Sequence, residues 1–120
     1  MKTVMLVEDT VLHRKLFETW LELGHYRVHV VADERLAIVT AAKLQPDVIV
    51  VDILLPYIDG REIIRGLCRN GGTEHIPIMA LSVLSEHQDE DSCYAAGARV
   101  FRSKSIRRVD FLECLDALVA

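Results

Sequence analysis

Four short hydrophobic runs in this chain are each followed by polar residues suited to binding a metal ion or a phosphate. The runs and the residues that follow them are Val4–Val7 with Glu8 and Asp9, Val48–Val51 with Asp52, Ile78–Leu81 with Ser82, and Val100–Phe101 with Lys104. Runs of this length, bounded by polar residues, are typical of buried strands. If the strands are parallel and belong to one sheet, their polar ends meet at its carboxyl edge, where open α/β sheets bind ligands.

Helical patterns separate these runs along the whole chain. The predicted strands are 4–7, 26–30, 48–51, 76–81 and 98–101, and the predicted helices are 10–23, 32–44, 61–69, 85–96 and 108–119. Regular alternation of strands and helices favours a doubly wound α/β domain with a parallel sheet. We therefore expect one domain over residues 1–120, with five strands in the flavodoxin-like order 2-1-3-4-5 and five helices.

Three segments give more detail about the layers. Leu12, Leu16, Trp20 and Leu23 recur at three- and four-residue steps, which predicts an amphipathic helix. Apolar and charged residues alternate in the strand 26–30, as expected near a sheet edge, whereas the strand 48–51 is wholly apolar. A wholly apolar strand indicates that helices cover both faces of the sheet.

Composition narrows the class of protein. The 120 residues are 51% hydrophobic and 27% charged, which is typical of a globular domain and not of a disordered chain. A net charge of −4 gives no overall attraction to nucleic acid or to an anionic membrane. The first apolar run is too short for a signal peptide, and no segment is long enough to span a membrane, so we expect a cytoplasmic protein. The three cysteines are widely spaced and are consistent with a reducing compartment.

The acidic residues at the predicted sheet edge suggest a metal site. Glu8, Asp9 and Asp52 would repel one another at close range unless a cation neutralised them. Mg²⁺ prefers oxygen ligands and is usually held by one or two carboxylates together with water and phosphate. We expect Asp9, Asp52 and the backbone carbonyl of Leu54 to be direct ligands, with Glu8 acting through water.

The same edge suits phosphoryl transfer. A carboxylate can act as a nucleophile and form an acyl phosphate, and Asp52 is the candidate because it ends the central strand. Lys104 would bring an ammonium group to one phosphate oxygen, and the hydroxyl of Ser82 would donate a hydrogen bond to another. A charge-assisted bond of this kind contributes about 1.5–3 kcal/mol, enough to pull the loop at Ser82 inward.

Together these positions resemble the receiver domain of bacterial two-component response regulators. The resemblance rests on Glu8-Asp9, Asp52 followed by Pro56 and Gly60, Ser82, Ala96-Gly97-Ala98, and Lys104. It implies phosphorylation of Asp52 by a histidine kinase or phosphotransfer protein, a requirement for Mg²⁺, and a downstream protein target. It also implies that Phe101 moves with Ser82, and that the output surface lies on the fourth helix, fifth strand and fifth helix. The chain resembles a stand-alone receiver of the chemotaxis or single-domain cell-cycle type.

Two positions depart from the pattern of that family. Ser105 follows the lysine where the family usually has proline, so the placement of Lys104 is less constrained. Val83 follows the switch hydroxyl where alanine or glycine is usual, and Leu54 near the phosphate is also apolar. Our hypothesis is that these side chains shield the phosphoryl group from water.

Other functions remain open at the level of sequence. A degenerate receiver could dock partners without phosphorylation. An enzyme such as an aspartate-nucleophile phosphatase usually has a second acid two residues after the nucleophile, where this chain has Leu54. A flavodoxin-type carrier is disfavoured because the first turn is acidic where a phosphate would need amides. We expect no separate enzymatic activity beyond the domain's own phosphoryl transfer and dephosphorylation. His13 lies one helical turn beyond Asp9, and both a site residue and a solvated histidine fit the sequence.

Overall fold

The computed structural model describes residues 1–83 and 87–120, without the side chains of residues 87 and 88. The elements are β1 Thr3–Val7, α1 Val11–Leu23, β2 Arg27–Val31, the short 3₁₀ helix η1 Glu34–Leu36, α2 Ala37–Leu44, β3 Val48–Asp52, α3 Gly60–Arg69, β4 Ile78–Ser82, α4 His87–Ala96, β5 Val100–Ser103 and α5 Arg108–Val119. Each strand and helix that the hydrophobic pattern predicts is present in these residues. The first two positions of the helix predicted over 85–96 lie outside the described residues.

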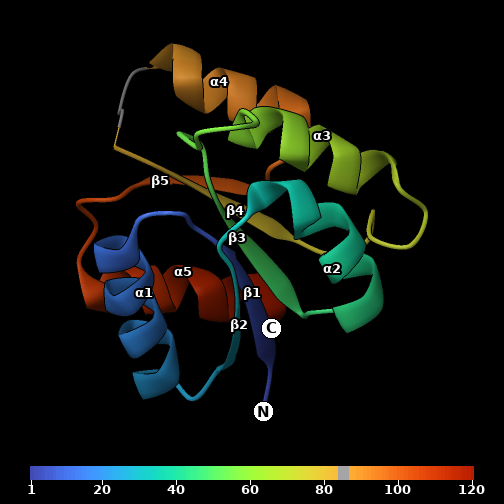
Figure 1. The fold of residues 1–120 in the computed structure, drawn as a ribbon. Coiled ribbons are helices and arrows are strands. Elements are labelled where there is room, and N and C mark those ends of the chain that lie inside the picture. The colour runs from blue at the N-terminus through green and yellow to red at the C-terminus, as the bar shows by residue number, and fades with distance from the viewer. Residues whose placement is uncertain (84–86) are drawn as a thin grey trace.

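The five strands form one parallel sheet in the order β2-β1-β3-β4-β5, which confirms the predicted fold. Helices α1 and α5 cover one face, and α2, α3 and α4 cover the other (Figure 1). Successive side chains of a strand point to opposite faces, so Val4 and Leu6 pack with α1 and α5, whereas Met5 and Val7 pack on the other side. The central strand β3 is buried along its whole length, as its sequence predicts.

Helix α1 forms as predicted, but of the apolar stripe seen in its sequence only Trp20 packs on the core, where it contacts Phe17 and Phe111. Phe17 and Leu21 are fully buried, whereas Leu12 and Leu23 are 74% and 58% exposed. The ring of Phe17 packs against Phe111 of α5, with centroids 5.3 Å apart. Aromatic packing between α1 and α5 therefore decides the rotation of the helix.

The ends of β1, β3, β4 and β5 lie at one edge of the sheet, and local contacts fix the loops there. The start of α3 approaches the end of β3 so closely that a Cβ at Gly60 would overlap the carbonyl group of Asp52. Strand β5 extends to Ser103, beyond its predicted end, and therefore carries the chain directly to Lys104. No helix in the described ranges is long and apolar enough to cross a membrane.

Candidate phosphoryl and metal site

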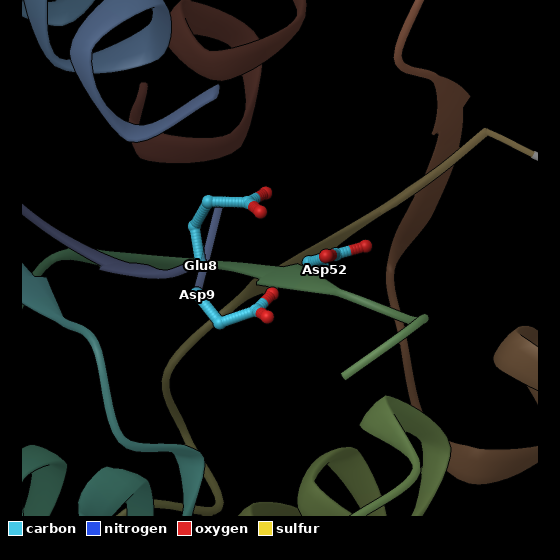
Figure 2. Close-up of side chains that lie close together, drawn as sticks. All are labelled: Glu8, Asp9 and Asp52. Carbon is cyan, nitrogen blue, oxygen red and sulfur yellow. The ribbon is translucent and has the colours of Figure 1, made fainter. Parts of the chain in front are cut away.

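Three carboxyl groups converge at the carboxyl edge of the sheet. Glu8 and Asp9 follow β1, Asp52 ends β3, and one oxygen of each lies within 4.8 Å of the others. Figure 2 shows the three side chains directed toward a shared space beyond the strand ends. Glu8 and Asp52 are almost completely buried, at 1% and 3% exposure, whereas Asp9 is partly exposed. The sequence-based prediction that these carboxylates meet is confirmed.

The side chain of Lys104 lies in this acidic cluster. Its Nζ is 2.7 Å from Oε2 of Glu8 and 3.0 Å from Oδ2 of Asp52. The Lys104 side chain is only 6% exposed, so these ion pairs form largely away from water. In the absence of another cation, the ammonium group partly neutralises the two buried carboxylates.

The loop around Lys104 is held without a proline. The backbone N–H of Lys104 donates to the carbonyl of Ser82 at 2.8 Å, which joins this loop to the end of β4. The N–H of Ser105 donates to the Ser103 hydroxyl, and the two hydroxyls of these serines are 2.8 Å apart. Serine hydroxyls can stabilise turns in this way. The departure at Ser105 therefore leaves Lys104 inside the site.

Burial and charge both act on the phosphoacceptor candidate. Burial and the nearby carboxylate of Glu8 raise the pKa of Asp52 from 3.8 to about 6. Lys104 and the N–H of Leu54, which donates to Oδ1 of Asp52 at 3.2 Å, act in the opposite direction. Burial and the Glu8 carboxylate together outweigh the effects of Lys104 and the Leu54 N–H, so the pocket favours an additional positive charge.

Histidine 13 also belongs to the site, which the sequence left open. Its Nδ1 is 3.0 Å from Nζ of Lys104 and 3.8 Å from Oε1 of Glu8. Because the ammonium group can only donate, Nδ1 of His13 is the acceptor in this contact. His13 lies in the first turn of α1, which follows the end of β1, and this position brings its ring to the site.

Two further predicted residues lie near the cluster. Ser82 is fully buried at the end of β4. Leu54 is tied to Asp52 by its amide, and its role as a ligand through the carbonyl remains a prediction. The side chains of Leu54 and Val83 are 47% and 56% exposed, so both border solvent. Their proposed shielding of a phosphoryl group also remains a prediction.

Phe101 lies in β5 and is 6% exposed. Its backbone N–H donates to the hydroxyl of Tyr94 at 3.2 Å, which joins β5 to α4. Tyr94 could not be identified from the sequence, since a single tyrosine in a mostly polar helix has no distinctive pattern. The contact connects two of the three elements expected to form the output surface.

The set of donors fits a hard divalent cation. The converging atoms are carboxylate oxygens, and Mg²⁺ is usually held by such groups together with water. Glu8, Asp9 and Asp52 are therefore the residues of this chain that would hold Mg²⁺.

Comparison with known proteins places these observations in a family. The sequence model of the response regulator receiver domain matches residues 4–116. The polar-differentiation response regulator DivK of Brucella anthropi is 32% identical over 116 residues, which cover 97% of this chain and 94% of DivK. DivK of Brucella ovis is also 32% identical, with the same coverage.

Solved structures agree with the sequence matches. The receiver domain of a sensor histidine kinase from Pseudomonas aeruginosa, described with a magnesium ion coordinated in its active-site cleft, superposes with a TM-score of 0.91. It is 28% identical, and the alignment covers 98% of this chain and 97% of that domain. The Vibrio cholerae chemotaxis protein CheY4 superposes with a TM-score of 0.91 at 25% identity, covering 98% of both chains.

Proposed function

The chain belongs to the response regulator receiver domain family, and on that basis we propose that it is a signalling switch that accepts a phosphoryl group on Asp52. The observation that carries the proposal is the convergence of Glu8, Asp9 and Asp52 with Lys104 at one sheet edge. A buried carboxylate between other acids and one lysine is suited to phosphoryl transfer, which depends mainly on positioning and charge neutralisation.

Asp52 is the proposed nucleophile. One of its carboxylate oxygens attacks the phosphorus atom of a phosphoimidazole or a small acyl phosphate, which forms an O–P bond. The bond between phosphorus and the leaving group breaks, and the leaving group departs with that electron pair. The carboxylate must be ionised to attack, so a pKa of about 6 leaves Asp52 mostly reactive at neutral pH.

The acidic residues would hold Mg²⁺ through the carboxylates of Asp9 and Asp52, with Glu8 acting through water. When bound, the ion neutralises charge on the transferred phosphoryl group and on the carboxylates around it. Lys104 holds its ammonium group at Oδ2 of Asp52, where it can pair with a phosphoryl oxygen. His13 accepts from the same ammonium group and helps to keep it at the site.

Ser82 and Phe101 are the proposed switch residues. The hydroxyl of Ser82 would donate to a phosphoryl oxygen, and this bond would draw in the loop that follows β4. The Ser82 carbonyl already accepts from the N–H of Lys104, and this bond would couple a movement of one loop to the other. The contact between Phe101 and Tyr94 supports transmission to the surface formed by α4, β5 and α5.

A histidine kinase or a phosphotransfer protein is the proposed donor, and a downstream protein is the proposed target. We propose no direct binding to nucleic acid, since the net charge is −4, and no membrane insertion, since no helix in the described residues is long and apolar enough. We place the protein in the cytoplasm, where such a relay operates. Its only chemistry would be its own phosphorylation and dephosphorylation.

Intact mass spectrometry after incubation with acetyl phosphate and MgCl₂ tests the function. The wild type is expected to gain one phosphoryl group, and Asp52→Ala is expected to gain none. Asp59→Ala is the control, because Asp59 caps α3 and pairs with Arg61 outside the carboxylate cluster. A wild type that remains unmodified with Mg²⁺ present would instead favour the degenerate receiver that docks partners without phosphorylation.

A further inference from the structure

A second buried carboxylate lies outside the phosphoryl site. Glu34 is in η1 and is 2% exposed, although glutamate is rarely buried unless it is paired. It is not one of the three acids that converge at the site, and it has no ion pair among the described residues. Burying such a group without compensating bonds is costly, so its contacts indicate what it does.

The carboxylate of Glu34 binds the backbone of the loop between β3 and α3. Its Oε1 accepts from the N–H of Tyr57 at 2.6 Å and, at a longer 3.4 Å, from the N–H of Ile58. Its Oε2 has no hydrogen-bond partner in the part of the chain that the structure describes. The hydrogen bonds that the Glu34 side chain accepts from described residues therefore all come from this one loop.

The next residue holds the same loop from its outer side. The guanidinium group of Arg35 lies 4.4 Å from the centre of the Tyr57 ring, which is a cation–π contact. Two bonds of 2.9 Å to the carboxylate of Asp33 fix the orientation of that guanidinium group. Residues 33–35 thus bind Tyr57 both at its amide and at its ring.

The loop that Glu34 holds is the one that leaves the phosphoacceptor. Asp52 ends β3, and the N–H of Leu54 donates to its carboxylate. Tyr57 is three residues further along the chain. On its other side, the segment that carries Glu34 follows β2, whose last residue, Val31, accepts from the N–H of Glu8 at 3.2 Å. Residues 31–35 therefore connect the end of β1 with the loop after β3.

From this arrangement we infer that Glu34 is a positioning residue for the divalent-cation site. By holding the amides of Tyr57 and Ile58, it fixes the loop that carries Leu54 relative to Glu8 and Asp9. The inference rests on the proposed function, because it requires that the cluster binds Mg²⁺. Groups that orient metal ligands without touching the ion commonly contribute strongly to affinity.

Two substitutions separate the geometry of Glu34 from its charge. Glu34→Gln loses the charge but keeps an oxygen that can accept from both amides. Glu34→Asp keeps the charge but is one methylene shorter, so it cannot reach both amides from the same backbone. Calorimetric titration of the metal-free proteins with Mg²⁺ alone gives the dissociation constant, and amide hydrogen exchange reports on Tyr57 and Ile58.

We expect Glu34→Asp to weaken Mg²⁺ binding about tenfold and to accelerate exchange of the two amides, while Glu34→Gln stays within about twofold of the wild type. Thr73→Val is the control for lost stability, because the buried Thr73 hydroxyl donates to the Leu67 carbonyl outside this loop. It should leave Mg²⁺ affinity unchanged.

Weakening in Glu34→Gln as large as in Glu34→Asp would overturn the inference, because Glu34→Gln keeps the accepting oxygen and this oxygen would then not be enough to preserve Mg²⁺ binding. Unchanged affinity in Glu34→Asp would overturn it as well. A wild type that does not bind Mg²⁺ would instead contradict the proposed function, so the two failures are distinguishable.

Discussion

Two buried carboxylates close to the same loop, Asp52 and Glu34, are stabilised in different ways. Asp52 lies beside another carboxylate, Glu8, and pairs with the ammonium group of Lys104. Glu34 forms no ion pair among the described residues, and its carboxylate accepts from the backbone amides of residues 57 and 58. A carboxylate among charges is sensitive to any cation or phosphoryl group that arrives, whereas one bound to amides fixes a backbone. The same functional group therefore suits chemistry in one place and positioning in the other.

The largest expected effect is on the free energy of unfolding, when the buried charge of Asp52 is removed. Burial and Glu8 raise the pKa of Asp52 above its unfolded value, so the stability contributed by its protonated form is fully present below about pH 3.8 and lost as pH rises through about 6. Asp52→Asn should therefore stabilise the metal-free protein at pH 7.5 by up to roughly 3 kcal/mol. The gain should shrink toward pH 4. Urea denaturation across this pH range measures it.

Asp59→Asn is the matched control, with the opposite sign. Hydrogen bonds from Arg61 lower the pKa of Asp59, so its contribution to stability is present at neutral pH and is lost as pH falls. Its replacement should destabilise the protein at pH 7.5. If Asp52→Asn also destabilised the metal-free protein at that pH, the charge of Asp52 would not be costly. The contrast between Asp52 and Glu34 would then be wrong.

Replacing Lys104 should have opposite effects on phosphoryl transfer and on Mg²⁺ binding. Lys104→Met removes one charge-assisted bond, which corresponds to about 2 kcal/mol, so phosphorylation by acetyl phosphate should slow about 30-fold. Mg²⁺ should bind more tightly, because the ammonium group no longer competes for Glu8 and Asp52. Rate measurements by mass spectrometry and calorimetric Mg²⁺ titration test both statements.

The loop bound by Glu34 should keep its structure in Lys104→Met. Exchange of the Tyr57 and Ile58 amides should be the same in Lys104→Met as in the wild type. Lys43→Met, on the exposed side of α2, is the control for losing a lysine. Weaker Mg²⁺ binding in Lys104→Met would contradict the view that the lysine occupies the place of a cation.

The smallest expected effect lies at the rim of the pocket. Val83 is 56% exposed beside Ser82, and its branched side chain can limit the approach of water to the phosphoryl group. Val83→Ala should speed dephosphorylation about two- to threefold, which is under 1 kcal/mol. The decay of the phosphorylated protein after removal of the donor gives the rate. Unchanged or slower decay would remove the shielding hypothesis.

Much of the fold and the centre of the site could be predicted because they follow from strand order. Parallel strands place all their carboxyl ends at one edge, so Glu8, Asp9, Asp52 and Lys104 meet once the sheet forms. The rotation of α1 could not be predicted in the same way. Phe17 and Leu21 form a second apolar stripe beside the longer one, and only packing against Phe111 selects it.

The role of Glu34 could not be predicted from the sequence either. Asp33, Glu34 and Arg35 follow a strand and look like the start of a helix, and Asp33 does accept from the N–H of Arg35 in that manner. The informative contact joins Glu34 to Tyr57, 23 residues away. No local periodicity encodes such a contact, because it depends on how the loop after β3 packs against η1.

The most direct test of the account is to locate the phosphoryl group. After reaction with acetyl phosphate and MgCl₂, borohydride reduces an acyl phosphate to an alcohol, and peptide mass mapping identifies the altered residue. We expect modification at Asp52 that depends on Mg²⁺ and is abolished by chelation. Modification of another residue, or equal modification of Asp52 after chelation, would contradict it.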